Sequence, residues 1–325
     1  MLSKINEIPT LSVLVVGDVM IDAYLFGKIE RMSPEAPVPV VSLTSKDERI
    51  GGAGNVACNA ISLGAKAHIA TAIGDDDAGE KMLSLLKTRG IGIQACVIEK
   101  GRPTTIKTRI INDEEHMLRV DNETTESILD STTDTIIGKC TSILEEESIE
   151  VIIIEDYDKG VMSERLFLFL QEEALKRNIP LAVDPKFKNF KLYKGVDLFK
   201  PNLKELREGL TASIASSDHL SLENAVDTLH SELNPKISLT TLGSDGMWIH
   251  SPENEVNHHH TPGVKRTIVD VSGAGDTVIT VAALMLAVGA SPQEIAKAAN
   301  IAGGLVCEKS GVEEISLKLL INELV

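Results

Sequence analysis

The feature that most constrains this chain is the alternation of short apolar runs with longer segments of helical periodicity. The first run, Ser12–Gly17, reads SVLVVG without a charged residue, which is typical of a strand that is buried on both faces. Further strands are expected at His68–Ile73, Val151–Ile154, Leu181–Val183, Leu198–Phe199 and Ile237–Thr241, and helices at Asn55–Leu63, Ala78–Arg89, Ser163–Arg177, Thr277–Val288 and Pro292–Glu308. Strands separated by helices predict a parallel sheet covered by helices on both faces, which is a three-layer α/β/α domain.

Two segments do not follow this pattern. Val38–Thr44 and Thr104–Val120 are strand-like but half polar, and in the second segment two alternating stretches flank Asn112-Asp113, which is a hairpin signal. Because such strands would not be stable inside a buried parallel sheet, we expect a small antiparallel β lid beside one domain that covers residues 1–325. Exposed sheet edges favour pairing with another chain, so a homodimer through the lid is expected.

The charge balance excludes several classes of partner. The chain has 48 Asp and Glu residues against 32 Lys and Arg residues, a formal net charge of −16. This charge disfavours binding to nucleic acid or to an anionic membrane surface. Aromatic residues make up only 3% of the chain, which also disfavours stacking on exposed bases. A small anionic substrate would need a pocket with local positive charge.

The cysteines and the apolar segments indicate a cytoplasmic protein. The four cysteines form no C-x-x-C pair, as expected for reduced thiols. The N-terminal apolar run stops at Asp18, so no signal peptide is expected. The longest uncharged stretch, 277–293, is interrupted by Gly289 and Pro292, and it predicts a buried helix rather than a membrane span.

A glycine cluster near the C-terminus is the strongest functional signal. Gly273-Ala274-Gly275 precedes an apolar helix, and small residues there leave backbone N–H groups open to an anion. Asp276 follows in the first helical turn, where a carboxylate beside a bound phosphate is electrostatically costly. We expect Asp276 to take a proton from a hydroxyl group that attacks phosphorus. The alternative is a glycine-rich turn in which Asp276 only begins the helix.

A second cluster, Gly51–Asn55, opens another helix. Its pattern Gly52-x-Gly54-x-x-Ala57 matches the dinucleotide fingerprint, with acidic residues 75–77 about 20 positions later. However, the preceding residues 45–49 are polar and charged, and the fingerprint belongs on the first strand–helix unit of such a fold. An NAD-dependent oxidoreductase is therefore a rival hypothesis. The chain has no Walker A motif, so phosphate transfer would proceed without a P-loop.

Other polar groups allow more than one interpretation. Asn202 and Glu205 lie one helical turn apart and can face one site, or Asn202 can cap a helix that carries an exposed Glu205. The acidic residues in 155–158 follow an apolar run, where either magnesium ligands or a solvated acidic loop would fit. The run His258–His260 is expected to be a polar strand edge, because consecutive side chains of a strand point to opposite faces and cannot converge on one metal ion.

Together these motifs resemble the ribokinase-like (PfkB) carbohydrate kinases, and the resemblance covers nearly the whole chain. The first family signature fits from Gly51 to Gly74, and the second fits from Asp270 to Asp276. The second signature then departs from the family, because Thr280 and Val281 stand where small residues are usual. The resemblance implies a kinase that uses ATP and Mg²⁺. A kinase for another sugar, such as fructose or ribose, and a non-catalytic sugar-phosphate sensor on the same fold are the remaining rivals.

The resemblance also implies roles for individual residues. Asp276 would be the base, and the anion would be bound by Gly273, Ala274 and Gly275. The sugar would be contacted by Asp22, Gly51, Gly52 and Asn55, and the nucleotide by Asn202, Glu205, Thr241, Gly243, Gly246 and Asn300. Asn202 and Glu205 would also support magnesium indirectly, and a monovalent cation, K⁺, would lie near Asp270 and Ser272.

Four segments narrow the resemblance to one subfamily. Arg31–Val40, Leu118–Asp121, Asp156–Gly160 and Asp184–Lys186 look like segments of D-glycero-β-D-manno-heptose-7-phosphate kinases. This implies phosphorylation of the anomeric hydroxyl of the heptose 7-phosphate to the 1,7-bisphosphate, on the route to ADP-heptose and the lipopolysaccharide core. Bifunctional members carry a nucleotidyltransferase domain after the kinase, and the chain ends at Val325, so a separate nucleotidyltransferase is expected to perform the later step.

The substrate phosphate would need basic groups. Thr105, Lys107 and Arg109 alternate along one expected strand and so project to the same face. A lysine and an arginine beside a hydroxyl suit a phosphate group, although they could also be solvated cations that protect a sheet edge. Arg31 or Lys186 are alternative sources of the positive charge.

Overall fold

The computed structural model describes residues 1–113, 115–253 and 257–324. Within these residues a nine-stranded sheet forms the centre of the molecule, with strand order β13-β12-β11-β10-β9-β8-β1-β4-β5. The strands are β1 (Ser12–Gly17), β4 (Lys66–Gly74), β5 (Gly92–Glu99), β8 (Val151–Glu155), β9 (Leu181–Asp184), β10 (Leu198–Phe199), β11 (Ile237–Thr241), β12 (Met247–His250) and β13 (His258–Thr261). Neighbouring strands run parallel from β11 to β5, whereas β12 and β13 form an antiparallel edge.

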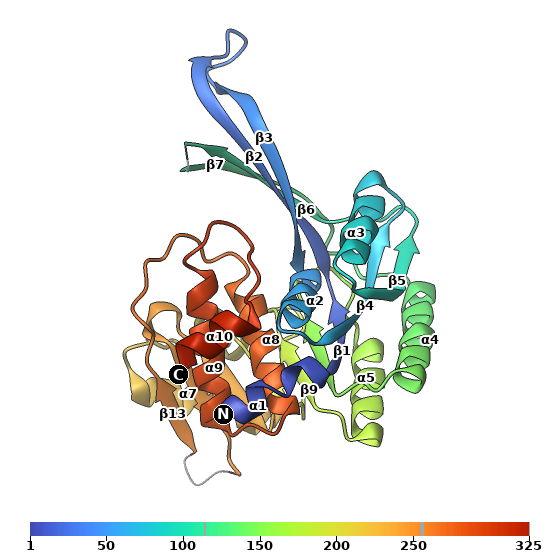
Figure 1. Ribbon diagram of the computed structural model, residues 1–325, viewed down its shortest axis with the longest axis vertical. Helices are drawn as coiled ribbons and strands as arrows, with labels where there is room; N and C mark the ends of the chain where they lie inside the picture. Colours follow the sequence, from blue (N-terminus) through green and yellow to red (C-terminus); the bar gives the residue numbers. More distant parts are fainter. Residues whose placement is uncertain (114, 254–256, 325) are drawn as a thin grey trace.

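Helices cover both faces of this sheet (Figure 1). They are α1 (Leu2–Ile5), α2 (Ala53–Ser62), α3 (Asp77–Thr88), α4 (Asp130–Glu146), α5 (Glu164–Arg177), α6 (Leu203–Leu210), α7 (His219–Leu233), α8 (Ala274–Ala287), α9 (Pro292–Val306) and α10 (Leu317–Leu324), with short 3₁₀ turns at Ile8–Thr10 and Gly243–Asp245. The three-layer α/β/α fold predicted from the apolar runs is therefore confirmed. In the described part of the chain, no helix is both long and apolar enough to cross a bilayer.

The central strand shows why a continuous apolar run was needed. Val13 and Val15 point into the core that packs under α2, α8 and α9, and Leu14 and Val16 point into the core under α4, α5 and α7. All four side chains are fully buried. Because successive residues of a strand face opposite sides, a strand between two helical layers must be apolar at every position.

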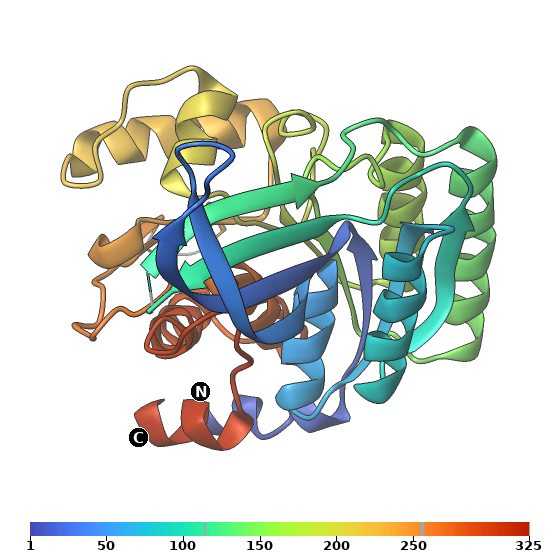
Figure 2. The same ribbon diagram turned by 90° about the horizontal axis from the view of Figure 1, so that it is seen from above.

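The lid is a second sheet, of order β3-β2-β6-β7, formed by β2 (Val19–Met32), β3 (Pro39–Gly52), β6 (Ile106–Asn112) and β7 (Glu115–Asn122). It projects from the main domain and crosses above the carboxyl ends of the central strands (Figures 1 and 2). The expected hairpin at Asn112-Asp113 joins β6 to β7, but the lid is not wholly antiparallel, because β2 and β6 pair in parallel. The chain reaches β6 through β4 and β5 of the main sheet, so it re-enters the lid in the same direction as β2.

Candidate active site

The predicted anion site lies at the start of α8. Gly273 is the residue before the helix and has φ of 77°, a left-handed conformation that favours glycine. A Cβ atom at this position would lie 2.8 Å from Nδ2 of Asn55. A Cβ atom on Gly275 would lie 3.8 Å from both Asp184 Oδ2 and Lys200 Nζ. The small residues thus keep the first turn of α8 open between α2 and the strand-end charges.

Asp276 is almost completely buried in the first turn of α8, with 2% of its surface exposed. Its Oδ2 accepts a hydrogen bond from Asn55 Nδ2 at 2.8 Å, and its Oδ1 accepts one from the Tyr157 hydroxyl at 2.8 Å. Burial raises the pKa of Asp276 to about 6, while the two hydrogen bonds act in the opposite direction. A carboxyl group with a pKa close to neutrality is suited to accept a proton from a hydroxyl group.

The two donors to Asp276 are themselves held in place. Asn55 is buried on α2, and its Oδ1 accepts a hydrogen bond from Asn59. Tyr157 lies on the loop after β8, and that loop is folded around Asp18, whose carboxylate accepts hydrogen bonds from the backbone N–H groups of Tyr157, Lys159 and Val161. In the sequence, Asp18 stood out only as the residue at which the N-terminal apolar run stops. Its role in fixing the Tyr157 loop depends on contacts across 139 residues, which no local motif displays.

Charged side chains gather at the carboxyl ends of β8, β9 and β10. Lys200 Nζ pairs with Asp184 Oδ2 at 2.7 Å, and Lys186 Nζ pairs with Glu205 Oε1. Glu155 is fully buried, and neither of its carboxylate oxygens has a partner among the described residues, nor does Oδ1 of Asp184. The interpretation of this segment as a solvated acidic loop is thus wrong for Glu155, because the residue ends a strand in the middle of the sheet.

This cluster fits a divalent cation. Burial, together with the negative charges of Asp184 and Asp276, raises the pKa of Glu155 well above its usual range. Buried carboxylate oxygens without partners are costly, and carboxylate oxygens are the ligands that Mg²⁺ takes in phosphate-transferring sites. Glu155, for which the sequence allowed a magnesium role, and Asp184, for which it indicated none, therefore provide a donor set for Mg²⁺.

Asn202 and Glu205 form a capping box at the start of α6. The Asn202 side chain accepts from the backbone N–H of Glu205 at 2.8 Å, and Glu205 Oε2 accepts from the backbone N–H of Asn202 at 2.8 Å. The capping alternative is thus present, but Glu205 is buried instead of exposed, because its second oxygen bonds Lys186. The same residue pair therefore fixes the helix start and the position of a lysine.

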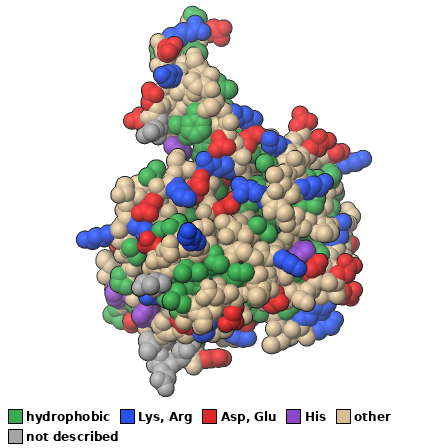
Figure 3. Space-filling view, viewed as in Figure 1, with side chains coloured by type: hydrophobic (Ala, Val, Ile, Leu, Met, Phe, Trp, Pro, Cys, Tyr) green, Lys and Arg blue, Asp and Glu red, His purple; other side chains and the backbone are tan. Residues whose placement is uncertain are grey.

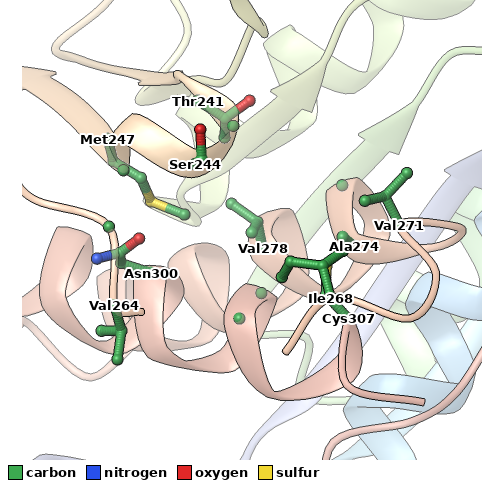
Figure 4. Close-up of a pocket in the computed structure, with 16 residues that line it drawn as sticks. Thr241, Ser244, Met247, Val264, Ile268, Val271, Ala274, Val278, Asn300 and Cys307 are labelled. Atoms are coloured by element: carbon green, nitrogen blue, oxygen red, sulfur yellow. The ribbon is translucent and has the colours of Figure 1, made fainter. Parts of the chain in front are cut away.

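A pocket of about 360 Å³ lies beside the glycine cluster. Four of the six residues that were predicted to contact the nucleotide line this pocket, namely Thr241, Gly243, Gly246 and Asn300 (Figure 4). The other two, Asn202 and Glu205, do not line it. Ala274 and Gly275 complete the wall toward α8. The remaining lining is largely apolar, which suits the flat ring of a nucleobase.

A second pocket of about 490 Å³ adjoins the first and shares Thr241, Gly243 and Gly275 with it. Asn202 lines this second pocket, together with four basic side chains: Lys186, Lys200, Lys204 and Arg207. These side chains can supply the local positive charge that an anionic substrate requires on this acidic protein, beside the first pocket and the start of α8.

The predicted sugar-contacting residues lie at the base of the lid. Asp22 on β2 is buried, and Gly51 on β3 packs so closely against it that a Cβ atom would overlap its carboxylate. Arg109 on β6 pairs with Asp22. Lys107, the next residue on the same face, contacts Glu123 at 2.7 Å and Asp121 at 3.3 Å. The predicted phosphate-binding cations thus share one face of β6, as expected, and both carry carboxylate partners.

Asp270 ties the loop before α8 to the loop after α9. Its Oδ1 accepts from the backbone N–H of Ser272, and its Oδ2 accepts from the backbone N–H of Gly311, each at 2.9 Å. These hydrogen bonds lower the pKa of Asp270 against the effect of its partial burial. The carboxylate thus remains charged near Ser272, at the place where the family resemblance implies a monovalent cation.

Comparison with known proteins supports the same interpretation. A family model described as pfkB family carbohydrate kinase matches residues 10–318. A protein named bifunctional protein HldE from Campylobacter curvus is 37% identical over 300 residues, which cover 92% of this chain and 62% of that protein. A protein of the same name from Desulfatibacillum aliphaticivorans is 38% identical over 314 residues, which cover 96% of this chain and 63% of that protein. The chain thus spans a little under two thirds of the length of these relatives.

Solved structures share the fold. Phosphofructokinase-2 from Escherichia coli, in complex with substrates and products, superposes with a TM-score of 0.78 at 20% identity, covering 96% of this chain and 97% of that chain. Ribokinase from Arabidopsis thaliana, complexed with ribose and ATP, superposes with a TM-score of 0.72 at 17% identity, covering 97% of this chain and 98% of that chain.

Proposed function

The chain belongs to the pfkB family of carbohydrate kinases, and from this premise we propose that it phosphorylates the anomeric hydroxyl of D-glycero-β-D-manno-heptose 7-phosphate with ATP. The observation that carries the proposal is the environment of Asp276. This buried carboxyl group has a pKa of about 6, and the preceding residue, Gly275, lines both the largely apolar pocket and the lysine-rich pocket. The rival oxidoreductase is disfavoured, because the Gly52–Ala57 pattern follows a lid strand instead of the first strand of the sheet.

In this mechanism, Asp276 accepts the proton of the anomeric hydroxyl as that oxygen attacks the γ-phosphorus of ATP. Asn55 and Tyr157 hold the Asp276 carboxylate in one orientation, so its lone pairs are aimed before the substrate arrives. The backbone N–H groups of the first turn of α8 stabilise the transferring phosphoryl group. The nucleobase occupies the pocket lined by Thr241, Gly243, Gly246 and Asn300.

Magnesium and basic side chains neutralise the phosphates. Glu155 and Asp184 would hold Mg²⁺, with Asn202 and Glu205 supporting it indirectly, and the ion would supply charge neutralisation to the nucleotide phosphates. Lys186, Lys200, Lys204 and Arg207 surround the same pocket and offset the acidic character of the protein there. We extend the proposal to K⁺ near Asp270 and Ser272, where the charged carboxylate of Asp270 would favour a monovalent cation.

The heptose substrate is proposed from the four subfamily-like segments, two of which line the site. Tyr157 belongs to Asp156–Gly160, and Asp184 and Lys186 belong to Asp184–Lys186. Asp22, Gly51, Gly52 and Asn55 would contact the sugar hydroxyls. Lys107 and Arg109 would contact the 7-phosphate. An ammonium group has three N–H donors, so Lys107 can serve a phosphate in addition to Asp121 and Glu123.

The proposal includes two partners. A second copy of the chain would pair through the lid, where Leu118 and Val120 of β7 are more than half exposed. A nucleotidyltransferase, which the subfamily resemblance implies, would act in a later step that follows the kinase reaction.

An ADP-release assay over a panel of sugars and sugar phosphates tests the proposed substrate. The panel contains the heptose 7-phosphate, the unphosphorylated heptose, fructose 6-phosphate and ribose. The proposal predicts the largest kcat/KM for the heptose 7-phosphate. A larger value for fructose 6-phosphate or ribose would contradict the heptose as the substrate. Sugar-dependent turnover would reject the sensor, and NAD binding without turnover of ATP would favour the oxidoreductase.

A further inference from the structure

Histidines are concentrated at one edge of the main sheet, away from the proposed catalytic centre. Six of the eight histidines of the chain lie between residues 219 and 260. They belong to α7 and to the antiparallel strands β12 and β13, which lie beside each other at the lower left of Figure 1. Since β12 runs antiparallel to β11, Met247 lies at the nucleotide pocket and His250 lies at the opposite end of the strand.

Three potential metal ligands converge at that opposite end. His250 on β12 is directly opposite His258 on β13, and their rings stack with centroids 4.0 Å apart. Oδ1 of Asp227 on α7 lies 3.2 Å from His258 Nε2 and 4.0 Å from His250 Nε2. One ligating atom from each residue lies within 4.8 Å of the others. The two histidines that converge come from neighbouring strands, and the consecutive histidines 258–260 do not meet at this place.

The state of these rings suits coordination. His250 is buried with 5% of its surface exposed, and its Nε2 is the ring nitrogen that lies toward Asp227 Oδ1, at 4.0 Å. Burial and the neighbouring His258 lower the pKa of His250, which favours the neutral form of the ring. His230 lies edge-on to His250 with ring centroids 4.3 Å apart, and burial lowers the pKa of His230 to about 4. A positively charged ring therefore does not oppose a cation at this place.

We propose that Asp227, His250 and His258 form a binding site for a divalent transition metal that accepts nitrogen ligands, such as Zn²⁺, Ni²⁺ or Co²⁺. Two imidazole nitrogens and one carboxylate oxygen are a donor set that these ions prefer over Mg²⁺. The site would connect α7 to the β12–β13 edge. The side chain of Asp227 is 61% exposed, so a metal ion bound to this third ligand would be accessible from solvent.

Metal binding would change the surroundings of a single reporter residue. Trp248 is the only tryptophan of the chain, and its Nε1–H donates to His258 Nδ1 at 3.1 Å. This bond assigns the His258 proton to Nε2, where it faces Asp227. For a metal to bind Nε2 of the neutral ring, the ring proton must be on Nδ1 instead, and the hydrogen bond from Trp248 to Nδ1 must then break. The stacked rings must also rotate, because both Nε2 lone pairs have to point at one ion.

Trp248 fluorescence and calorimetry can be measured together on the full chain without a histidine tag. Mg²⁺ is present in excess so that it occupies the oxygen-rich catalytic centre, and Ni²⁺ alone is the probe. The proposal predicts saturable binding of one equivalent with a change in Trp248 fluorescence. Because loss of even an outer-shell partner typically weakens metal binding by about 10–100-fold, His250→Gln and Asp227→Asn should each weaken it by at least about tenfold.

His259→Gln is the matched control. His259 lies next to His258 on the same strand but projects to the opposite face, so its substitution should leave Ni²⁺ binding unchanged. Thermal unfolding without metal, measured for each variant, shows whether it is folded. The proposal is overturned if the wild type binds no equivalent of Ni²⁺ saturably, or if folded His250→Gln and Asp227→Asn bind as the wild type does. In those cases the cluster only packs against Trp248.

Discussion

A carboxyl group with a pKa of about 6 changes its charge within the pH range of ordinary assays, and Asp276 is such a group. If Asp276 acts as base in its charged form, kcat/KM falls as the pH drops through about 6. The Tyr157 hydroxyl donates to Asp276 and so favours the charged form. This hydroxyl therefore acts on the reaction through Asp276, as a positioning group.

Tyr157→Phe should move the acid limb of the pH profile of kcat/KM to higher pH. The reason is that the substitution removes a hydrogen bond which lowers the pKa of Asp276. The matched control is Tyr193→Phe, since the Tyr193 hydroxyl donates to the buried Asp156 and does not contact Asp276. An acid limb that stays in place in Tyr157→Phe, or that moves equally in Tyr193→Phe, would contradict this role.

Lys107→Ala should reduce kcat/KM for the heptose 7-phosphate and leave that for the unphosphorylated heptose almost unchanged. Loss of a charge-assisted contact costs about 1.5–3 kcal/mol. Arg119→Ala is the control, because Arg119 also pairs with Asp121 but is 57% exposed on β7. Equal losses on both sugars, or none on either, would remove Lys107 from the phosphate site.

Arg109 has a different expected signature. Its partner is Asp22, the proposed sugar-contacting carboxylate, so Arg109→Ala should impair both sugars. The sequence placed Lys107 and Arg109 on one face through strand alternation alone. The sequence pattern could not predict their carboxylate partners, because Asp22 and Glu123 lie on other segments of the chain.

At the scale of the elements, the strands that cross the core were the most predictable. β1, β10 and β11 have the expected boundaries, since strands between two helical layers are mostly short runs of apolar or small residues. β2 was not expected as a strand, because no single hydrophobic pattern runs along its whole length. Its side chains are buried near Val19 and exposed near Met32. Its partner β3 was recognised only near its outer end for the same reason.

The contacts that complete the site were less predictable than its motifs. Asp276 and the glycine cluster are consecutive in the chain, so their pattern is visible locally. Tyr157 and Glu155 reach the same place from the end of β8, and only the order of strands in the sheet brings them there. Sequence patterns therefore identified the helix start that is proposed to bind the anion. They did not identify the loop that orients the proposed base, Asp276.

Gly273→Ala tests the helix start. At φ of 77° an alanine is strained, and its Cβ would lie 2.8 Å from Asn55 Nδ2. The variant should lose about 1 kcal/mol or more in its free energy of unfolding and should also lose kinase turnover. Chemical denaturation and the ADP-release assay measure these effects.

The control for this substitution is Gly138→Ala in α4, where nothing lies within 4 Å of the new Cβ. Alanine is preferred over glycine in a helix interior, so this variant should keep its activity and gain stability. If Gly273→Ala behaved like Gly138→Ala, the close packing of α8 against Asn55 would not matter for the site.

The whole molecule combines an acidic surface with a basic pocket and an exposed lid. The net charge is −16, yet four basic side chains line the proposed phosphate pocket. Figure 3 shows apolar side chains among the charged ones of the lid, and Leu43, Leu118 and Val120 are each more than half exposed there. Apolar side chains on an exposed sheet favour association with a second sheet.

We therefore expect a homodimer that forms through the lid. Light scattering across micromolar concentrations should show a dimer for the wild type and a monomer for the double variant Leu118→Asp, Val120→Asp. Leu175→Asp is the control, because Leu175 is 83% exposed on α5 and far from the lid in sequence and fold. A wild type that is monomeric throughout, or a dimer that survives the double variant, would contradict pairing through the lid.

The most direct test of the central claim is the rate of ADP release with heptose 7-phosphate, measured for the wild type and for Asp276→Asn, together with ATP binding by calorimetry. The asparagine keeps the shape of the side chain and removes its ability to accept the proton. We predict that turnover falls by at least about a hundredfold while ATP binding is retained, because the pocket around Thr241, Gly243, Gly246 and Asn300 is unchanged. Near-normal turnover in folded Asp276→Asn would contradict the assignment of Asp276 as the base of this kinase.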